Sequence, residues 1–148
     1  MFEPAFVIDA SVFVADAQPQ EPFHADANLL LETLAAHQCV IYVPAIVLSE
    51  IAAAIARGAD DPELAREAVG LYRQWPGLRL APVDEMLGNL AAEIAARQRI
   101  RGCDAVYVAL AYREQAVLIS LDSQQRERAP SSVTAYTPAQ ALADWFQP

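Results

Sequence analysis

Apolar residues along this chain form two kinds of pattern: short continuous runs, and longer stretches with helical spacing. The continuous runs are bounded by polar, proline or glycine positions, which is typical of strands buried on both faces of a sheet. These runs predict strands at residues 5–9, 39–43, 78–81, 117–121 and 133–136.

The stretches between the runs carry apolar residues three and four positions apart, the spacing of an amphipathic helix. Pro44 is expected at the first position of one helix and Gly58 at its end. Asp84 is expected to cap another helix, in which Met86 and Leu87 face inward with Leu90, Ala91 and Ile94. Helices are predicted over residues 26–37, 44–57, 61–75, 84–97, 104–114 and 137–145, with a short helical turn at 11–15 and a loop at 18–23.

Short apolar strands that alternate with helices predict a mostly parallel sheet covered on both faces, in a three-layer α/β/α fold. The 148 residues are interpreted as a single domain over residues 1–148. Right-handed crossovers bring the carboxyl ends of parallel strands to one edge of the sheet. Open sheets of this kind bind ligands outside those ends.

Four carboxylates stand in apolar surroundings near such positions. Asp9 ends the first strand, Asp104 opens an apolar helix, and Asp122 follows the strand at 117–121. Glu50 lies in the run 45–56, where Ser49 is the one other polar residue. Burial of an unpaired carboxylate costs several kcal/mol. A hard divalent cation, which prefers carboxylate oxygens, would stabilise all four at once.

Each aspartate taken alone also has an ordinary structural interpretation as an N-cap or turn residue. For Glu50 the alternative is a thin exposed stripe on its helix, since no basic residue lies within one helical turn of it. The neighbours that would serve these structural roles are Ser11 beside Asp9, Arg101 before Asp104 and Arg126 after Asp122.

Composition restricts the class of protein. The net charge is −9, and all ten basic residues are arginine, which argues against a broad basic nucleic-acid surface. Affinity for nucleic acid must therefore be local and metal-assisted. No apolar run approaches the roughly 20 residues of a membrane helix, and the N-terminus lacks the basic segment of a signal peptide.

The cysteines and histidines do not suggest a zinc site. Cys39 and Cys103 have no metal-ligand spacing, and His24 and His37 are isolated, as surface histidines usually are. Two cysteines of this kind favour a reduced, cytoplasmic protein.

The order strand-Asp, helix-Glu, helix-Asp, strand-Asp resembles the PIN-domain family, and the chain length resembles that of its stand-alone VapC-type toxins. The sequence departs from the family pattern at Ala10, where a hydroxyl residue is frequent, and at Gln125, where an apolar residue is common. The stretches that carry the resemblance are residues 7–11 (VIDAS), 44–51 (PAIVLSEI), 103–111 (CDAVYVALA) and 119–122 (ISLD).

This resemblance implies a ribonuclease that depends on Mg²⁺ or Mn²⁺, acts as the toxin of a type II toxin-antitoxin pair, and has RNA and an antitoxin protein as partners. A homodimer is also expected. The implied metal-binding and catalytic residues are Asp9, Glu50, Asp104 and Asp122, supported by Ser11 and Ser120. Arginines near the acids in sequence are candidates to bind phosphate or, equally, solvated helix ends: Arg99, Arg101, Arg126 and Arg128.

Two other classes fit less well. Enzymes that accept a phosphoryl group on a strand-end aspartate also use a lysine, which this chain lacks, and one type needs a second aspartate where Ser11 stands. The remaining alternative is a catalytically degenerate PIN-like module that acts through protein-protein binding. For such a module, the apolar residues Leu71, Tyr72 and Trp75 would serve either as a dimer surface or as core.

Overall fold

The computed structural model describes residues 4–147, so the ends of the expected 1–148 domain, residues 1–3 and 148, lie outside the described residues. The centre is a five-stranded sheet in the order β3-β2-β1-β4-β5, and each neighbouring pair is parallel. The predicted parallel sheet is therefore confirmed. Its strands are β1 (Phe6–Ile8), β2 (Ile41–Pro44), β3 (Leu78–Ala81), β4 (Val117–Ile119) and β5 (Ala135–Tyr136).

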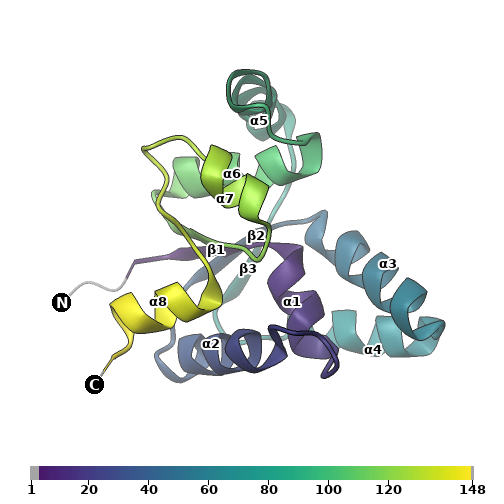
Figure 1. Cartoon of the computed structure of the whole chain (residues 1–148). Helices are drawn as coiled ribbons and strands as arrows, with labels where there is room; N and C mark the ends of the chain where they lie inside the picture. Colours follow the sequence, from purple (N-terminus) through teal and green to yellow (C-terminus); the bar gives the residue numbers. More distant parts are fainter. Residues whose placement is uncertain (1–3, 148) are drawn as a thin grey trace.

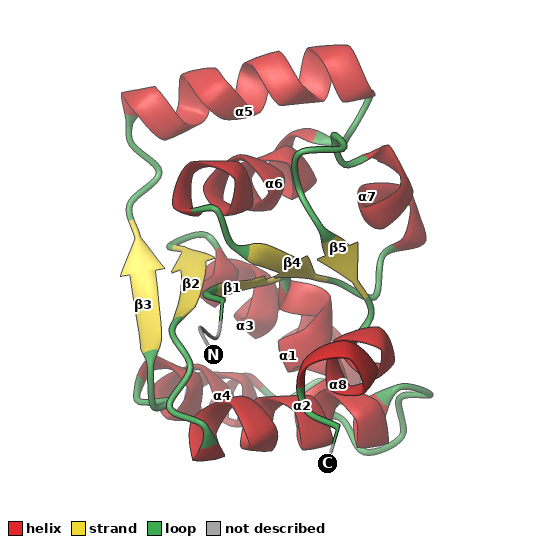
Figure 2. Cartoon of the chain, turned by 90° about the vertical axis from the view of Figure 1, so that its left-hand side faces the viewer, coloured by secondary structure: helices red, strands yellow, loops and turns green. Residues whose placement is uncertain are grey.

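Helices cover both faces of the sheet, as the three-layer prediction required (Figure 1). Figure 2 shows α5, α6 and α7 on one face and α1, α2, α3, α4 and α8 on the other. In the described part of the chain, every helix is too short or too polar to traverse a lipid bilayer. The helices are α1 (Ala10–Ala17), α2 (His24–Ala36), α3 (Val47–Ala59), α4 (Pro62–Arg73), α5 (Glu85–Gln98), α6 (Gly102–Glu114), α7 (Ser123–Arg128) and α8 (Pro138–Trp145).

The core lies where β1 and β4 meet α1 and α6. All three residues of β1 and all three of β4 are buried, which accounts for their continuous apolar sequences. Helix α6 is buried through its middle, from Tyr107 through Ala111. Because both faces of the central strands are covered, the ends of these strands are held in fixed positions.

The strand order reverses beside β1, and this positions a site. The chain runs from β1 to β2 and β3 on one side, then returns to β4 on the other side of β1. Ligands bind at such a switch point, outside the carboxyl ends of the strands. The amide of Asp9, just after β1, donates a hydrogen bond of 2.9 Å to the carbonyl of Ile119 at the end of β4.

Two predicted boundaries around β2 and α3 are wrong. Pro44 is the last residue of β2, and α3 begins at Val47. The amides of Ile41 and Ala45 donate toward the β3 side, so the position of Pro44 faces β1, where the pairing already ends at Tyr42. The missing amide hydrogen of Pro44 therefore leaves no ladder bond unmade.

Helix α3 also continues through Gly58, against the prediction, and ends before Asp60, which adopts the left-handed conformation. A Cβ on Gly58 would lie 2.7 Å from Nε2 of the buried Gln18. Gly58 thus serves close packing and does not end the helix.

Further differences concern polar or edge positions. Helix α7 was not predicted, because its sequence, SQQRER, has no apolar period. Met86 is 80% exposed and not inward, since the buried stripe of α5 runs through Leu87, Ala91 and Ile94. In α4, Tyr72 is buried but Leu71 is 68% exposed.

Candidate metal centre

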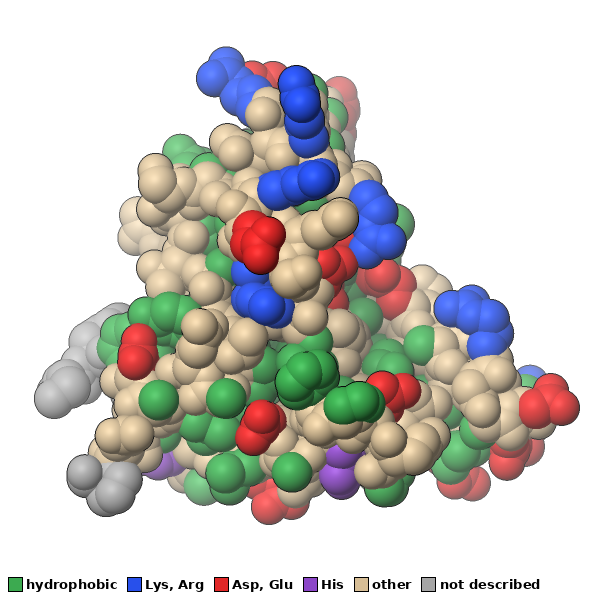
Figure 3. All heavy atoms as spheres, viewed as in Figure 1, with side chains coloured by type: hydrophobic (Ala, Val, Ile, Leu, Met, Phe, Trp, Pro, Cys, Tyr) green, Lys and Arg blue, Asp and Glu red, His purple; other side chains and the backbone are tan. Residues whose placement is uncertain are grey.

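All four predicted acids line one pocket at the switch point, with a volume of about 640 Å³. Asp9 follows β1, Glu50 lies in the first turn of α3, Asp104 in the first turn of α6, and Asp122 caps α7. Figure 3 shows acidic side chains in the hollow between α3 and the α6–α7 region, with basic side chains above them. The other lining residues are Ala10, Ser11, Val14, Ser49, Ala53, Ala54, Arg57 and Arg101.

Asp9 is the most buried of the four, with 6% of its surface exposed. Its Oδ2 accepts a hydrogen bond of 3.0 Å from the Ser11 amide, and its Oδ1 accepts one of 3.3 Å from Nε2 of Gln125. Burial raises the pKa of Asp9, and the charge of Asp104 raises it further, against the opposing effect of these hydrogen bonds. Asp9 is thus both a helix cap and a member of the acidic pocket.

Glu50 is half-buried and has a partner from another helix. The hydroxyl of Tyr107 on α6 donates a hydrogen bond of 2.6 Å to its Oε1. Burial raises the pKa of Glu50, and the charges of Asp9 and Asp104 add to this effect. The neighbours of Glu50 on its own helix did not reveal this partner, because Tyr107 lies 57 positions away in the sequence.

Asp104 and Asp122 share one arginine. Nε of Arg101 lies 2.9 Å from Oδ2 of Asp104, and its Nη2 lies 2.8 Å from Oδ2 of Asp122. The side chains of Asp104 and Asp122 are 14% and 23% exposed, whereas that of Arg101 is 74% exposed. The hydrogen bond and charge of Asp104, followed by the charge of Asp122, raise the pKa of Arg101. Asp104 is not an N-cap, since α6 begins before it, at Gly102.

Two serine hydroxyls accept hydrogen bonds from the segment that leads from β4 to Asp122. Oγ of Ser11 accepts a hydrogen bond of 3.1 Å from the Leu121 amide, and Oγ of the fully buried Ser120 accepts one of 3.0 Å from the Asp122 amide. The bond of Ser11 holds the segment after β4 against the start of α1, whereas the bond of Ser120 is local to that segment.

Gln125 contacts the acids of the site, although it was not predicted as a site residue. In the sequence it stood out only as a departure from the family pattern. It is 1% exposed, and its Nε2 donates to Oδ1 of Asp9 and, at 3.1 Å, to the carbonyl of Asp104. Its Oε1 is buried and has no hydrogen-bond partner among the described residues. The side-chain amide of Gln125 thus connects the carboxylate of Asp9 with the backbone carbonyl of Asp104.

The arginines are placed differently from one another. Arg101 lines the acidic pocket, whereas Nη1 of Arg126 donates to the Ser120 carbonyl at 2.8 Å, and Arg99 lines a smaller neighbouring pocket with Arg128. Arg57 lines the acidic pocket and was not predicted. The sequence did contain an indication of this, because Arg57 follows Glu50 by seven residues and such residues lie on the same face of a helix.

The chemistry of the donors fits a hard divalent cation, since carboxylate oxygens from four segments converge. As the side chains of residues 4–147 lie, no three histidine, cysteine, aspartate or glutamate residues form a group that would hold an ion directly. Magnesium keeps several of its waters and needs few direct protein ligands.

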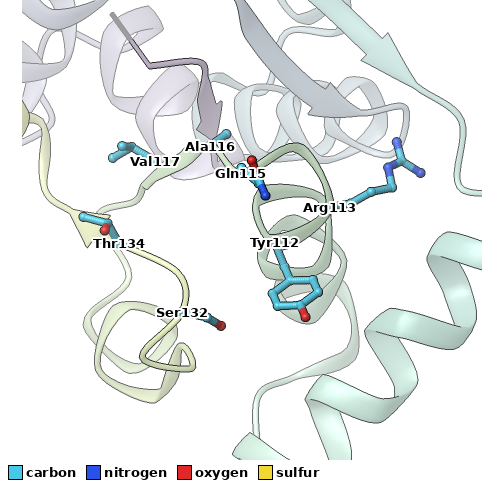
Figure 4. A pocket seen from close by; sticks show the side chains of 7 residues that line it. All are labelled: Tyr112, Arg113, Gln115, Ala116, Val117, Ser132 and Thr134. Atoms are coloured by element: carbon cyan, nitrogen blue, oxygen red, sulfur yellow. The ribbon is translucent and has the colours of Figure 1, made fainter. Parts of the chain in front are cut away.

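A second cavity, of about 550 Å³, lies at the opposite end of β4 (Figure 4). None of its lining residues is an acid, so it does not share the chemistry of the acidic pocket. These residues are Tyr112, Arg113, Gln115, Ala116, Val117, Ser132 and Thr134.

The sequence of residues 6–129 matches the family model of the PIN domain. A comparison with curated protein sequences finds no match. Among solved structures, the chain is similar to VapC20 of Mycobacterium tuberculosis, a sarcin-ricin loop cleaving toxin, with a TM-score of 0.71, 18% identity, and 88% of this chain and 99% of that chain covered.

Two further structures show the same similarity. VapBC2 from Rickettsia felis, bound to a DNA fragment from its promoter, has a TM-score of 0.68 at 16% identity, over 88% of this chain and 96% of that chain. FitAcB from Neisseria gonorrhoeae has a TM-score of 0.66 at 18% identity, over 90% and 98%. At these identities the similarity establishes a shared fold.

Proposed function

This chain belongs to the PIN-domain family, and we propose that it is a metal-dependent endoribonuclease, the toxin of a type II toxin-antitoxin pair. One observation carries the proposal: four carboxylates from four separate segments line a single pocket at the switch point of the sheet. Their convergence requires the whole fold and is not a local feature of one helix or loop.

The proposed cofactor is Mg²⁺ or Mn²⁺, which when bound supplies an activated water and neutralises charge on the scissile phosphate. Asp9, Glu50, Asp104 and Asp122 would hold the cation directly or through its waters. Gln125 and the Ser11 amide fix the carboxylate of Asp9, and Tyr107 fixes that of Glu50. The arrangement is thus oriented in advance, as a metal-dependent site requires.

The two arginines that line the pocket, Arg57 and Arg101, would bind the phosphates of the substrate. Because the chain is acidic, with a net charge of −9, contact with RNA depends on these local charges and on the metal. The Arg101 side chain is 74% exposed, and its ion pairs with Asp104 and Asp122 use Nε and Nη2, which leaves Nη1 for a phosphate. Arg99 and Arg126, turned toward neighbouring surfaces, would contact RNA outside the pocket.

The proposed partners are an RNA substrate, a cognate antitoxin protein and a second copy of the chain, and the proposed location is the cytoplasm. The similarity in fold to VapC20, described as a cleaving toxin, and to VapBC2 supports the toxin assignment. Cys39 and Cys103 are thiols, which fits a reducing compartment.

The test is cleavage of structured and single-stranded RNAs with Mn²⁺, with and without chelator. The wild-type protein should cleave only without chelator, and Asp9→Asn should reduce the rate by at least about a hundredfold, as loss of a main transition-state contact does. Asp60→Asn, a change at an exposed acid after α3, is the matched control and should cleave normally. Equal rates for Asp9→Asn and wild type would refute the assignment.

A catalytically degenerate PIN-like module is the second candidate. The observation that favours it is that Arg101 forms ion pairs with two of the acids without metal. A folded protein that binds neither Mn²⁺ nor Mg²⁺ but forms a stable complex with a protein partner would support this alternative.

A further inference from the structure

The guanidinium of Arg101 contacts two of the four acids that line the acidic pocket. Two different nitrogens contact two different carboxylates, at 2.9 Å to Asp104 and 2.8 Å to Asp122, and both contacts are made to an Oδ2 atom. One side chain therefore bridges the acid of α6 and the acid that caps α7. A divalent cation bound by both aspartates would bridge the same two elements.

The charge of the Arg101 guanidinium also acts on a third acid, Glu50. The charge of Arg101 opposes the effects of Asp9 and Asp104 on Glu50, so it acts across the pocket as well as on its direct partners. The guanidinium thus reduces the repulsion among carboxylates that would otherwise face one another with little compensation.

Nothing in the packing fixes Arg101 in this position. Its side chain is 74% exposed, and it precedes the first turn of α6, outside the helix. Exposed ion pairs are weak because water screens them and because ordering a long side chain costs entropy. A cation of higher charge density can therefore displace the guanidinium without unfolding any element.

We propose that Arg101 is a built-in counter-cation that competes with the divalent metal for the carboxylates of Asp104 and Asp122, so that metal binding expels its guanidinium from the pocket. The inference rests on the proposed function, because it requires that the acids bind metal. It goes further in assigning Arg101 a role before the substrate arrives: it stabilises the metal-free acids and weakens the apparent affinity for metal.

The experiment is calorimetric titration of Mn²⁺ into the wild-type protein, Arg101→Met, Arg101→Lys and Arg57→Met, each after removal of metal. Arg101→Met removes the competing charge but keeps an apolar stem of similar length. Arg101→Lys keeps the charge but replaces the two-nitrogen bridge with a single ammonium group. Arg57→Met removes a charge from the same pocket, at a residue that does not bridge the two aspartates.

We expect Arg101→Met to bind Mn²⁺ about tenfold more tightly than wild type, within the usual range of coupling between two binding events. Arg101→Lys should fall between them, and Arg57→Met should change the affinity by less than about twofold, since it alters the field but no contact.

Two results would overturn the inference and leave the proposed function standing: wild type and Arg101→Met bind Mn²⁺ equally, or Arg57→Met gains as much affinity as Arg101→Met. If no variant binds Mn²⁺, the proposed function fails and the inference fails with it. A cooperative thermal transition, measured before each titration, shows that the variant is folded.

Discussion

The hydroxyl of Tyr107 donates a hydrogen bond of 2.6 Å to Oε1 of Glu50, which ties a fully buried ring of α6 to an acid on α3. Burial, followed by this bond and the charges of Asp9 and Glu50, raises the pKa of Tyr107 well above its ordinary value. The tyrosine therefore stays protonated and acts as a donor at any pH at which the protein works. The two helices thus approach the pocket from opposite sides of the sheet with one acid already oriented.

Tyr107→Phe should destabilise the protein by about 1.5–3 kcal/mol, the usual contribution of a hydrogen bond to a charged group. It should also lower the affinity for Mn²⁺, because Glu50 loses its orientation. Urea denaturation and metal titration measure the two effects. Unchanged metal affinity would show that the hydrogen bond has only a structural role. The control is Tyr112→Phe, at an exposed tyrosine of the same helix, which should alter neither stability nor metal affinity.

Glu50→Gln keeps an oxygen that can accept the bond from Tyr107 but removes the charge that attracts a cation. Affinity for Mn²⁺ should fall by about tenfold or more, while the metal-free stability should hold or rise, since the neutral amide relieves repulsion from Asp9 and Asp104. Glu67→Gln on the exposed side of α4 should change neither quantity by more than about 0.5 kcal/mol. Equal affinities for wild type and Glu50→Gln would remove Glu50 from the site.

Metal should stabilise the folded chain. At a Mn²⁺ concentration about a hundredfold above its Kd, the free energy of unfolding should rise by about 2.7 kcal/mol, and chelator should reverse the gain. In Asp9→Asn the gain should shrink, but the metal-free protein should be at least as stable as wild type. The neutral amide removes the buried charge of Asp9 and its repulsion from Asp104, which offsets the loss of the hydrogen bond from Gln125. Melting curves that ignore Mn²⁺ would argue against a metal site.

Arg57 should contribute to RNA binding through phosphate contact. In an Asp9→Asn background that cannot cleave, Arg57→Met should weaken the affinity for a single-stranded RNA by a few-fold. It should also reduce the slope of log affinity against log salt by about 0.7, the value of one phosphate contact on a single strand. Fluorescence anisotropy at several salt concentrations measures both. Arg66→Met, on the exposed side of α4, should alter neither.

Tyr72 predicts a loss of stability in alkali. Its hydroxyl donates to Oδ2 of Asp16 at 2.6 Å, and the Phe13 carbonyl lies 3.0 Å from the same hydroxyl oxygen. Burial is the main cause that raises the pKa of Tyr72 above the ordinary value of 10.0. The unfolded chain releases this proton near pH 10, whereas the folded chain retains it. Stability that is present below pH 10 is therefore lost as the pH rises, by about 1.4 kcal/mol per unit.

The matched variant is Tyr72→Phe, which cannot ionise. It should be less stable at pH 8, but the wild-type advantage should shrink between pH 10 and 11.5 in urea denaturation. Parallel curves for the two proteins over this range would show that Tyr72 has an ordinary pKa.

The sequence was sufficient to predict the elements that are buried on both faces. The strands around Val7 and Leu118 are apolar because helices cover them on both sides, and the two strand-end aspartates follow from the same pattern. Helix α7 could not be found in this way. Its residues are polar and show no helical period. Its start depends on the side chain of Asp122, whose Oδ1 accepts a hydrogen bond from the backbone amide of Gln125.

Contacts between segments that are distant in the sequence could not be predicted either. The bond from Tyr107 to Glu50 joins residues 57 positions apart, and Gln125 reaches Asp9 over 116 positions. Gly58 was predicted as a helix end because glycine ends many helices. Its actual role, to admit the side chain of Gln18, depends on a loop that its own neighbours in sequence do not reveal.

The place of β4 beside β1 also governs when the protein becomes active during its own synthesis. β1 is made first, but the partner that receives the Asp9 amide, the carbonyl of Ile119, leaves the ribosome much later. At about 5–20 residues per second, the interval between Asp9 and Asp122 lasts on the order of ten seconds. Throughout that interval the nascent chain lacks a complete acidic pocket, so a nuclease built in this order cannot attack RNA near the ribosome until Asp122 has been made.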